Sequence, residues 1–446
     1  MFFYYASILS MLLVLLPINH FGYVISTPSP SPLYNTTTSF DNKTEEIFEI
    51  IKVIPFNSTY PSSILVDPIS NLVYVSVRPD HPYNYFPGSC SGQSTAATSN
   101  NLSRFSNVLA DQCSVIYVLD GDADQIIDVI RLGPGEEIHD MDIDHGLGTI
   151  YATGQYSYLV NDSKGNAEHV QHEDDVVYVI NKINHSKGYS ANDNINTERI
   201  TLYGEIEEGK EGDMSDIAVD TNNNINTIYA GIRYYQGGQE GIFIIPDISR
   251  IDSKLNGIND NISNTIKFIP LGNTGPEQIL VNDKMNTIYV LLEYDNFIAT
   301  MDGSTNEIKE NITLQNPRAM SINPSAGLLY VASGDSFWFN IVNMTTNKVI
   351  GVNTQISYPV ASAVNNITGK VFVAECLECD DFDFINGTSI YALDSDGSTI
   401  NWTTYENINI EENGLAINPL TNKLYAIGTN TKSELSNLYV IDISSK

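Results

Sequence analysis

The sequence predicts an all-β fold: a seven-bladed β-propeller with four-stranded blades, closed by an N-terminal strand that completes the last blade. Three observations favour it: a hairpin motif that recurs seven times, further strands after most copies, and a strand missing at the C-terminal end. Such a ring needs a large core, which 446 residues that are 42% hydrophobic can supply.

Each copy of the motif joins an alternating apolar strand to a second strand centred on Tyr or Phe. The turn between them is rich in Asp, Asn, Pro and Gly, a combination typical of β-hairpins. The seven copies span residues 64–75, 141–152, 217–230, 279–290, 320–331, 362–373 and 415–426.

A third apolar strand that ends in an acidic or Asn turn follows most hairpins, as in 115–121, 176–181, 298–303, 390–394 and 438–442. A fourth strand comes next, for example in 126–132. Four strands repeated seven times favour a propeller, whose neighbouring blades bury each other's faces, over an open sandwich, which needs no such period.

The two ends of the repeat region complement each other. The seventh unit stops at its third strand, residues 438–443. At the other end, residues 51–56 (Ile-Lys-Val-Ile-Pro-Phe) match the fourth strand of the third unit, residues 266–271 (Ile-Lys-Phe-Ile-Pro-Leu). We therefore expect residues 46–56 to complete the last blade and remove its free edge.

The hairpin core in 417–426 (Ile-Asn-Pro-Leu-Thr-Asn-Lys-Leu-Tyr-Ala) and 66–75, with Asp-Gly turns such as 301–306, resembles the YVTN-type β-propeller repeats of exported archaeal and bacterial proteins. The resemblance covers residues 46–446. The chain departs from that pattern because no copy has Asn at the fourth position of the tetrapeptide. The wider group of seven-bladed propellers contains both binding proteins and enzymes, so the resemblance implies a fold and no single activity.

The N-terminal residues 1–26 have the apolar stretch of a signal peptide at 8–16 but no Lys or Arg before it. We interpret them as a signal peptide or an N-terminal anchor. Residues 27–45 form a Pro/Ser/Thr-rich linker, and the propeller occupies residues 46–446. The expected location is extracellular or in the cell envelope.

The charge balance restricts the partners. Lys and Arg number 22 against 54 Asp and Glu, a net charge of −32. A chain this acidic lacks the basic surface that a nucleic-acid phosphate backbone requires, and an anionic bilayer repels it. We therefore expect no nucleic acid, and membrane contact only through the N-terminal segment if that segment is not cleaved.

Export favours disulfides, which we expect between Cys90 and Cys113 and between Cys376 and Cys379. A redox or metal role for the second pair is the alternative, but its acidic neighbours would raise rather than lower a thiol pKa. Glycosylation is also expected, because Asn-x-Ser/Thr sequons begin at Asn35, Asn42, Asn57, Asn101, Asn161, Asn184, Asn261, Asn311, Asn343, Asn366, Asn386 and Asn401.

The first strand of each blade lines the central channel, so the residues before these strands surround one channel mouth. The expected binding residues there are His139, Asp140, Asp216, Glu277 and Arg318. Their carboxylates are oxygen ligands of the kind that a divalent cation such as calcium prefers. The metal candidates are Asp140, Asp142, Asp216 and Glu277, and the alternative is a set of solvated loop ends. No other cofactor is expected.

Two Asp-rich segments resemble the start of a calcium loop, residues 120–124 and residues 394–398. In the first, Gln125 stands where an EF-hand has Gly, and Arg131 stands where it needs Glu. We therefore interpret both segments as hairpin turns between a third and a fourth strand.

Insertions between the second and third strands, at 78–112, 155–174 and 375–387, should emerge on one face. In the first insertion we expect exposed aromatic and imidazole side chains, which are suited to recognition. They are His81, Tyr83, Tyr85 and Phe86.

The leading functional hypothesis is a noncatalytic module that binds a protein or a glycan at the cell surface through these loops. The alternative is an enzyme, a lactonase-like hydrolase or a metal-assisted lyase, that uses the channel mouth around His139, Asp140, Asp216 and Glu277. A third reading is a structural envelope component. We assign no catalytic residue, because the chain has no Gly-x-Ser-x-Gly nucleophile elbow and no phosphate-binding Gly loop.

Overall fold

A computed structural model describes thirteen stretches of the chain, which are residues 48–56, 59–79, 114–133, 135–161, 167–180, 197–202, 213–221, 227–233, 240–246, 265–271, 275–334, 338–377 and 387–444. All of them belong to one compact unit, residues 45–446. The predicted signal peptide or anchor and the linker lie outside these stretches. In the described part of the chain, no helix is long and apolar enough to cross a membrane.

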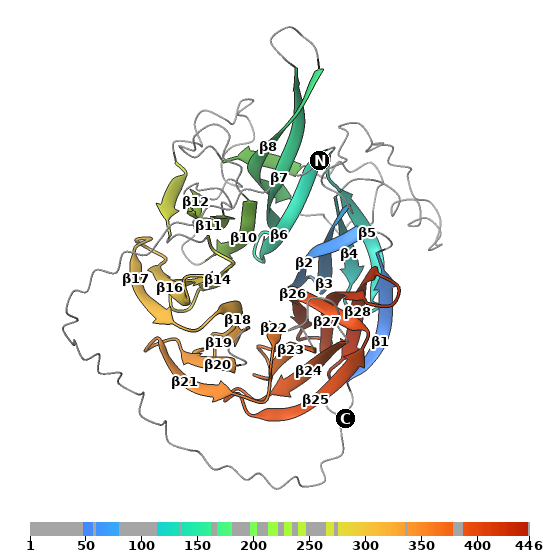
Figure 1. The fold of residues 1–446 in the computed structure, drawn as a ribbon, viewed down its shortest axis with the longest axis vertical. Coiled ribbons are helices and arrows are strands. Elements are labelled where there is room, and N and C mark those ends of the chain that lie inside the picture. The colour runs from blue at the N-terminus through green and yellow to red at the C-terminus, as the bar shows by residue number, and fades with distance from the viewer. Residues whose placement is uncertain are drawn as a thin grey trace, which may run out of the picture. The chain divides into compact units, whose positions relative to one another are not determined.

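The described residues form seven four-stranded antiparallel sheets arranged around a ring (Figure 1), so the predicted fold is confirmed. Blade 1 comprises β2 (Thr59–Asp67), β3 (Leu72–Pro79), β4 (Val115–Asp120) and β5 (Gln125–Arg131). Blade 2 comprises β6 (Glu136–Asp144), β7 (Thr149–Asn161), β8 (Ala167–Ile180) and β9 (Thr197–Thr201). Blade 3 comprises β10 (Asp213–Asp220), β11 (Thr227–Arg233), β12 (Gly241–Pro246) and β13 (Lys267–Pro270).

The remaining blades follow in chain order. Blade 4 comprises β14 (Gln278–Asn282), β15 (Thr287–Leu292), β16 (Phe297–Asp302) and β17 (Ile308–Thr313). Blade 5 comprises β18 (Pro317–Asn323), β19 (Leu328–Ser333), β20 (Trp338–Asn343) and β21 (Lys348–Asn353). Blade 6 comprises β22 (Pro359–Val364), β23 (Val371–Leu377), β24 (Gly387–Leu393) and β25 (Thr399–Glu406). Blade 7 comprises β26 (Ile408–Asn418), β27 (Lys423–Asn430), β28 (Leu435–Asp442) and β1 (Glu49–Pro55).

The predicted ring closure is confirmed by the strand order of blade 7. Strand β1 pairs antiparallel with β28, with Val53 opposite Tyr439 and Ile54 opposite Leu438. The Phe56 amide continues the pairing by donating to the Ser436 carbonyl at 2.9 Å. The N-terminal strand therefore covers the outer edge of the C-terminal strand, as an unpaired edge requires.

The hairpin turns explain the repeated Asp/Asn and Asn/Gly positions of the motif. The first turn residue caps the turn: the Asn365 side-chain oxygen accepts the Ile367 and Thr368 amides, each at 3.0 Å. The last turn residue adopts a left-handed conformation, with φ of 56° at Asn71 and 70° at Gly327. Asn and Gly are the residues that tolerate this conformation best.

The core lies between blades, and the motif tyrosine of several blades contacts the next blade. Tyr229, Tyr330 and Tyr425 are fully buried in the second strands of blades 3, 5 and 7. The Tyr330 hydroxyl donates to the Ser395 carbonyl in blade 6 at 2.7 Å, and the Tyr229 hydroxyl donates to Asn306 in blade 4 at 3.0 Å. In these blades the tyrosine hydroxyl binds the outer turn of the following blade, whereas blade 6 has Phe372 at the same position and relies on apolar packing.

The insertion expected as a loop at 155–174 differs from that expectation. Its backbone extends β7 and β8 into a long hairpin that projects from the ring (Figure 1). The strands pair continuously from Ile150 opposite Ile180 to Val160 opposite Val170. The pairing of β7 with β8 satisfies backbone N–H and C=O groups that a loop would leave to water.

The two other insertions fall largely on residues 80–113 and 378–386, outside the described residues. Cys376, at the end of β23, is buried and disulfide-bonded. Cys90, Cys113 and Cys379 lie outside the described residues, so both predicted pairings stay predictions.

Candidate functional site

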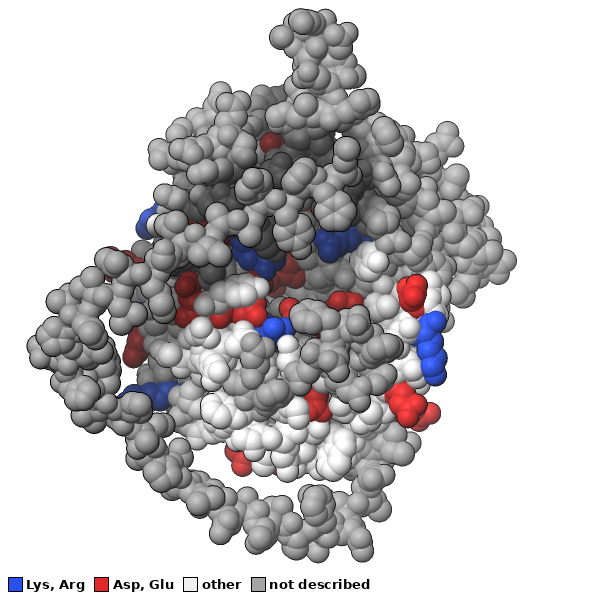
Figure 2. Space-filling model, in the orientation of Figure 1, with Lys and Arg blue, Asp and Glu red and all other residues white. Residues whose placement is uncertain are grey.

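The channel mouth is built from the starts of the innermost strands and the ends of the second strands. Antiparallel pairing brings these two chain segments together in every blade. Figure 2 shows acidic and basic side chains next to one another around the middle of the ring. The charged residues of this region come from six of the seven blades, and their contacts decide what the mouth can do.

Most of these charges form ion pairs between blades. Arg78 of blade 1 contacts Glu137 of blade 2 at 2.9 Å, and Glu137 also lies 3.9 Å from the His139 Nε2 atom. Arg233 of blade 3 forms a two-oxygen contact with Glu277 of blade 4. The carboxylate–guanidinium pairs therefore neutralise much of the local charge.

Arg318 forms the contact that spans the greatest part of the ring. Its Nε atom lies 3.3 Å from Glu293 of blade 4, and its Nη1 atom lies 2.9 Å from Glu412 of blade 7. The guanidinium also lies over the Tyr358 ring at 5.4 Å. Blade 5 is thus bridged to blade 7 past blade 6, so the channel is narrow on this side of its mouth.

Glu293 has the most unusual carboxyl group of the mouth. Burial raises its pKa to about 7, although the neighbouring Arg318 opposes the increase, and the charges of Glu277 and Glu412 raise it further. A carboxyl group whose pKa is raised toward neutral pH is suited to general acid or base chemistry.

Deeper in the channel wall, side chains of one blade accept backbone amides of the next. Asp140 accepts the Ile217 amide at 3.4 Å, and Asp142 accepts the Val219 amide at 2.8 Å. One blade further on, Asp216 accepts the Ile279 amide, and Gln278 accepts the Met320 amide. Asp140, Asp216 and Gln278 occupy the same motif position, so these contacts form an interblade belt from blade 2 to blade 5.

The three aspartates of the interblade belt also interact with one another. Burial, followed by the charge of Asp140 and a hydrogen bond with it, raises the pKa of Asp216 well above its usual range. Burial likewise raises the pKa of Asp142 to about 6. The raised pKa of Asp216 favours its neutral form, in which its carboxyl group is not repelled by the neighbouring Asp140 carboxylate.

The two histidines of the segment 139–145 lie at opposite ends of β6. His139 Nδ1 donates to the Met214 carbonyl of blade 3 at 2.6 Å, next to the mouth. His145 lies in the hairpin turn, where Nδ1 contacts Asp67 of blade 1 at 3.0 Å. The two imidazoles therefore contact different blades, His139 blade 3 and His145 blade 1.

The structure therefore brings the expected residues His139, Asp140, Asp216, Glu277 and Arg318 to the channel, with each one bound to a neighbouring blade. Among the residues that the structure describes, no three His, Cys, Asp or Glu side chains are arranged to hold a metal ion. The calcium expectation for Asp140, Asp142, Asp216 and Glu277 stays a prediction. His81, Tyr83, Tyr85 and Phe86 lie outside the described residues.

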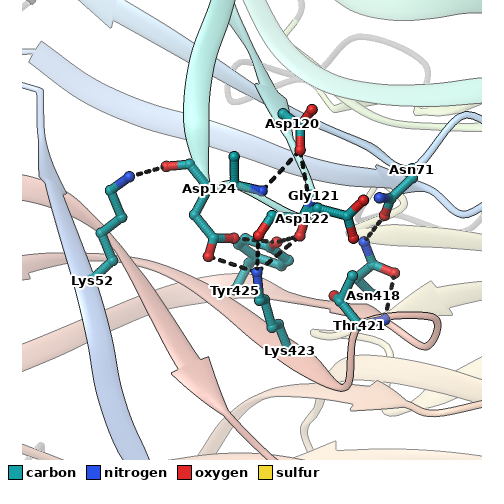
Figure 3. Close-up of polar contacts among 11 residues, drawn as sticks. Lys52, Asn71, Asp120, Gly121, Asp122, Asp124, Asn418, Thr421, Lys423 and Tyr425 are labelled. Atoms are coloured by element: carbon teal, nitrogen blue, oxygen red, sulfur yellow. Dashed lines mark hydrogen bonds and ion pairs between the residues drawn. The ribbon is translucent and has the colours of Figure 1, made fainter.

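The Asp-rich segment 120–124 is a hairpin turn, as interpreted from the sequence. The Asp120 carboxylate accepts the Asp122 and Ala123 amides, each at 2.9 Å. Lys423 of blade 7 inserts its ammonium group into the turn and contacts the Gly121 and Asp122 carbonyls and the Asp124 carboxylate (Figure 3). A lysine thus takes the place that a bound cation would have in a calcium loop.

Sequence reasoning missed Arg78, Arg233 and Glu293, although the motif contains a signal for them. Each lies four residues after the motif tyrosine, at the mouth end of a second strand. This position is polar or small in the other blades, so a comparison of the repeats at this offset would have found the three residues.

These observations define a seven-bladed β-propeller whose channel opens through a ring of paired charges. The chain is similar to a chain of the mitotic checkpoint complex, with a TM-score of 0.52 and 11% identity over 96% of this chain and 100% of that one. It also matches a chain of hydrazine synthase from Kuenenia stuttgartiensis, with a TM-score of 0.39 and 11% identity over 51% of this chain and 62% of that one. No family model and no curated protein matches the sequence. At such identity the first likeness shows the fold alone.

Proposed function

We propose that this chain is an exported, YVTN-type propeller that binds a protein or a glycan at the cell surface without catalysing a reaction. One observation carries the proposal. The charged side chains at the channel mouth form ion pairs with side chains of other blades, so they are not left open to a substrate. Arg233 with Glu277, and Arg318 with Glu293 and Glu412, are the main examples. The long insertions remain as recognition elements on a rigid ring.

Two further features support a binding role. One solved chain with a similar fold belongs to the mitotic checkpoint complex. The projecting β7–β8 hairpin is a two-stranded ribbon, and such ribbons are marginally stable alone in water, so contact with a partner would stabilise it.

The binding proposal is tested on intact cells that produce the full chain. Glycan-array binding and surface crosslinking are compared for the wild type, a deletion of residues 82–111, and the control variant Glu293→Gln. We expect the deletion to abolish the wild-type signal and the control to retain it. A wild-type protein that binds no glycan and crosslinks to no surface protein would refute the binding role.

Export is tested separately by the mature N-terminus and the location. Mass spectrometry of the protein recovered from the envelope or the medium should show a chain that starts near Thr27. An intact N-terminus on protein recovered only from the cytosol would contradict export while leaving the binding test unaffected.

One observation favours an enzyme as the second candidate, namely the Glu293 carboxyl that titrates near neutral pH between two arginines. This arrangement fits a lactonase-like hydrolase or a metal-assisted lyase that uses Glu293 as an acid or base. Lactone and ester hydrolysis by the wild type that disappears in Glu293→Gln would establish this alternative. Unchanged, background-level hydrolysis in both proteins would leave the binding role as the better account.

A further inference from the structure

The face opposite the channel mouth carries an unusual set of exposed aliphatic side chains at its hairpin tips. The exposed fractions are 73% for Ile69 in blade 1, 44% for Leu147 in blade 2, 67% for Ile367 in blade 6 and 57% for Leu420 in blade 7. We name these four residues the hairpin-tip arc. Turns are normally polar, so exposed Ile and Leu side chains at four tips need an explanation.

The four tips belong to consecutive blades, because blades 6, 7, 1 and 2 follow one another around the ring. Direct contacts join neighbouring tips. The Asn418 amide of blade 7 donates to Asn71 of blade 1 at 2.7 Å. His145 of blade 2 contacts Asp67 of blade 1 at 3.0 Å. These contacts place the tips of blades 7, 1 and 2 side by side, and the tip of blade 6 precedes them in the ring.

The tips of blades 4 and 5 provide an internal comparison. At the motif position of Ile69, Ile367 and Leu420, blade 4 has Lys284 and blade 5 has Ser325, both exposed. The fold therefore tolerates polar residues at this position, and stability does not require an aliphatic one. Among the hairpin tips that the structure describes, the exposed aliphatic side chains are thus grouped on consecutive blades, as a contact surface for a partner would be.

Acidic turns border the arc on the same face, because the turns after the first and the third strand of a blade point the same way. Asp122 in blade 1 and both Asp394 and Asp396 in blade 6 are exposed. The tip of blade 6 adjoins this turn, since a Cβ atom on Gly369 would lie 4.0 Å from the Ser395 Cβ atom. The nearby cation Lys423 is only 13% exposed and binds Asp124.

We propose that the hairpin-tip arc is a docking surface for a basic amphipathic segment of another protein. Aliphatic side chains along one side of the segment pack on Ile367, Leu420, Ile69 and Leu147. Its Lys and Arg side chains face the carboxylates of Asp122, Asp394 and Asp396. The complementarity of charge selects this occupant, because an acidic segment would be repelled and a purely apolar one would leave the acidic border unused.

The surface is distinct from the mouth and from the insertions that the proposed function uses. Those features lie where second strands end and third strands begin, at the other end of every blade. The propeller can thus hold two partners at once, one on each face, and the two proposals can fail independently.

The test uses the full chain and a labelled synthetic peptide of about 18 residues, with Leu at helical spacing and Lys elsewhere. Binding is measured by fluorescence anisotropy. The triple variant Ile69→Ser/Ile367→Ser/Leu420→Ser copies the Ser325 of blade 5 and leaves the charge unchanged. We expect it to weaken binding at least about tenfold. The matched control Ile350→Ser removes a side chain that is 60% exposed on β21, and it should bind as the wild type does.

Two further measurements complete the test. Asp122→Asn/Asp394→Asn should weaken binding of the Lys peptide, and a peptide with Glu in place of Lys should not bind the wild type. Equal binding by the wild type and the triple variant would overturn the proposal. Sedimentation with phosphatidylcholine vesicles, or self-association in ultracentrifugation, that depends on the same three residues would also overturn it and assign the arc to a bilayer or a second copy.

Discussion

At the scale of single residues, this propeller uses side chains of one blade to bind the next. Lys423 is the clearest case, because its ammonium group joins the last blade to the turn of the first (Figure 3). Asp124, its carboxylate partner, also accepts the Tyr425 hydroxyl at 2.8 Å. The point where the ring closes is thus stabilised by a partly buried cation as well as by strand pairing.

Replacing Lys423 by Met should therefore destabilise the ring by about 3 kcal/mol, because Asp124 would remain buried without its cation. The matched control is Lys309→Met, since the Lys309 and Asp302 pair lies on an exposed turn of blade 4, with Lys309 48% exposed. Urea denaturation measures both. A Lys423→Met protein that unfolds like the Lys309→Met protein would show that the contact contributes little.

The Glu293 carboxyl predicts a specific pH dependence. The pKa of this carboxyl is raised from 4.5 to about 7 in the folded state. Between pH 4.5 and 7 the folded protein therefore keeps a proton that the unfolded chain has released. Stability from this group is present below pH 4.5 and is lost as the pH rises through 7. At pH 8 the free energy of unfolding of Glu293→Gln should therefore exceed that of the wild type by about 1 to 3 kcal/mol.

Calorimetry between pH 5 and pH 8 checks the Glu293 prediction. The advantage of Glu293→Gln should shrink toward pH 5, where the wild-type carboxyl is protonated as well. A constant difference across this range would mean that the carboxylate, stabilised by Arg318, is charged throughout.

At the scale of elements, the hairpin turn is the unit that the motif encodes. Its last residue has φ of 70° at Gly327, while Asn occupies the same position in blades 1, 4 and 7. No atom lies within 4 Å of a Cβ built on Gly327, so a larger residue meets no steric obstacle there. Any cost of substitution comes from the backbone conformation alone.

Gly327→Ala should thus destabilise the protein by about 1 kcal/mol, because an L-residue other than Asn disfavours the left-handed region. The matched variant Gly327→Asn, which copies the other blades, should cost much less. Thermal unfolding of the two variants side by side measures the difference. Equal stability of both would contradict the assigned role of the turn conformation.

The tips of blades 1 and 2 also form a pH-dependent contact. Burial opposes ionisation of Asp67, but hydrogen bonds from His145, Ser70 and the Ile69 amide lower its pKa to about 2. The bond to Asp67 raises the pKa of His145 above 6.5, despite partial burial. The pair is therefore fully charged in the folded state between about pH 4 and 6.5.

The coupling between Asp67 and His145 should be largest in that range, at no more than about 1 kcal/mol because His145 is 43% exposed. It should fade as the pH rises through the pKa of His145 and again as it falls toward 2. A double-mutant cycle with Asp67→Asn and His145→Gln, measured at pH 5.5 and pH 9, tests this. Equal coupling at both values would exclude a charged imidazole.

At the scale of the whole molecule, β1 determines whether the ring closes. Ile54 and Phe56 are buried, and the Phe56 ring stacks on Tyr117 of blade 1 at 5.4 Å. Removing residues 46–56 would expose the edge of β28 and the core between blades 7 and 1. The truncated chain should lose several kcal/mol of stability, since one buried Phe alone contributes about 3.

A synthetic peptide of residues 46–56 should restore part of this stability when added to the truncated protein, because it can re-form the pairing with β28. The control is Ile51→Ser in the full chain, which changes a side chain that is 45% exposed and should alter the melting temperature little. A truncated chain that melts like the full-length protein would contradict closure by β1.

The blades could be predicted from the sequence, whereas the contacts at the channel mouth could not. The blades were predictable because each repeats one local pattern: alternation places apolar residues on the buried faces, and Asx and Gly positions define the turns. The closing strand was predictable because its apolar pattern, with Pro at the end, is that of a fourth strand. The β7–β8 extension was expected as a loop, since its polar composition hides its cross-strand register.

The sequence by itself determined the blade count, the closing strand and the end of the ring at which the charged residues gather. Only the tertiary structure decided how those residues pair. Glu277 contacts Arg233, Arg318 reaches Glu293 and Glu412, and Lys423 enters the turn at 120–124. These contacts join side chains of different blades, whose spacing is fixed by the closure of the ring and the width of the channel. Local sequence patterns contain no information on distances across a ring. The fold could therefore be predicted from the repeat, but the ion pairs at the channel mouth could not.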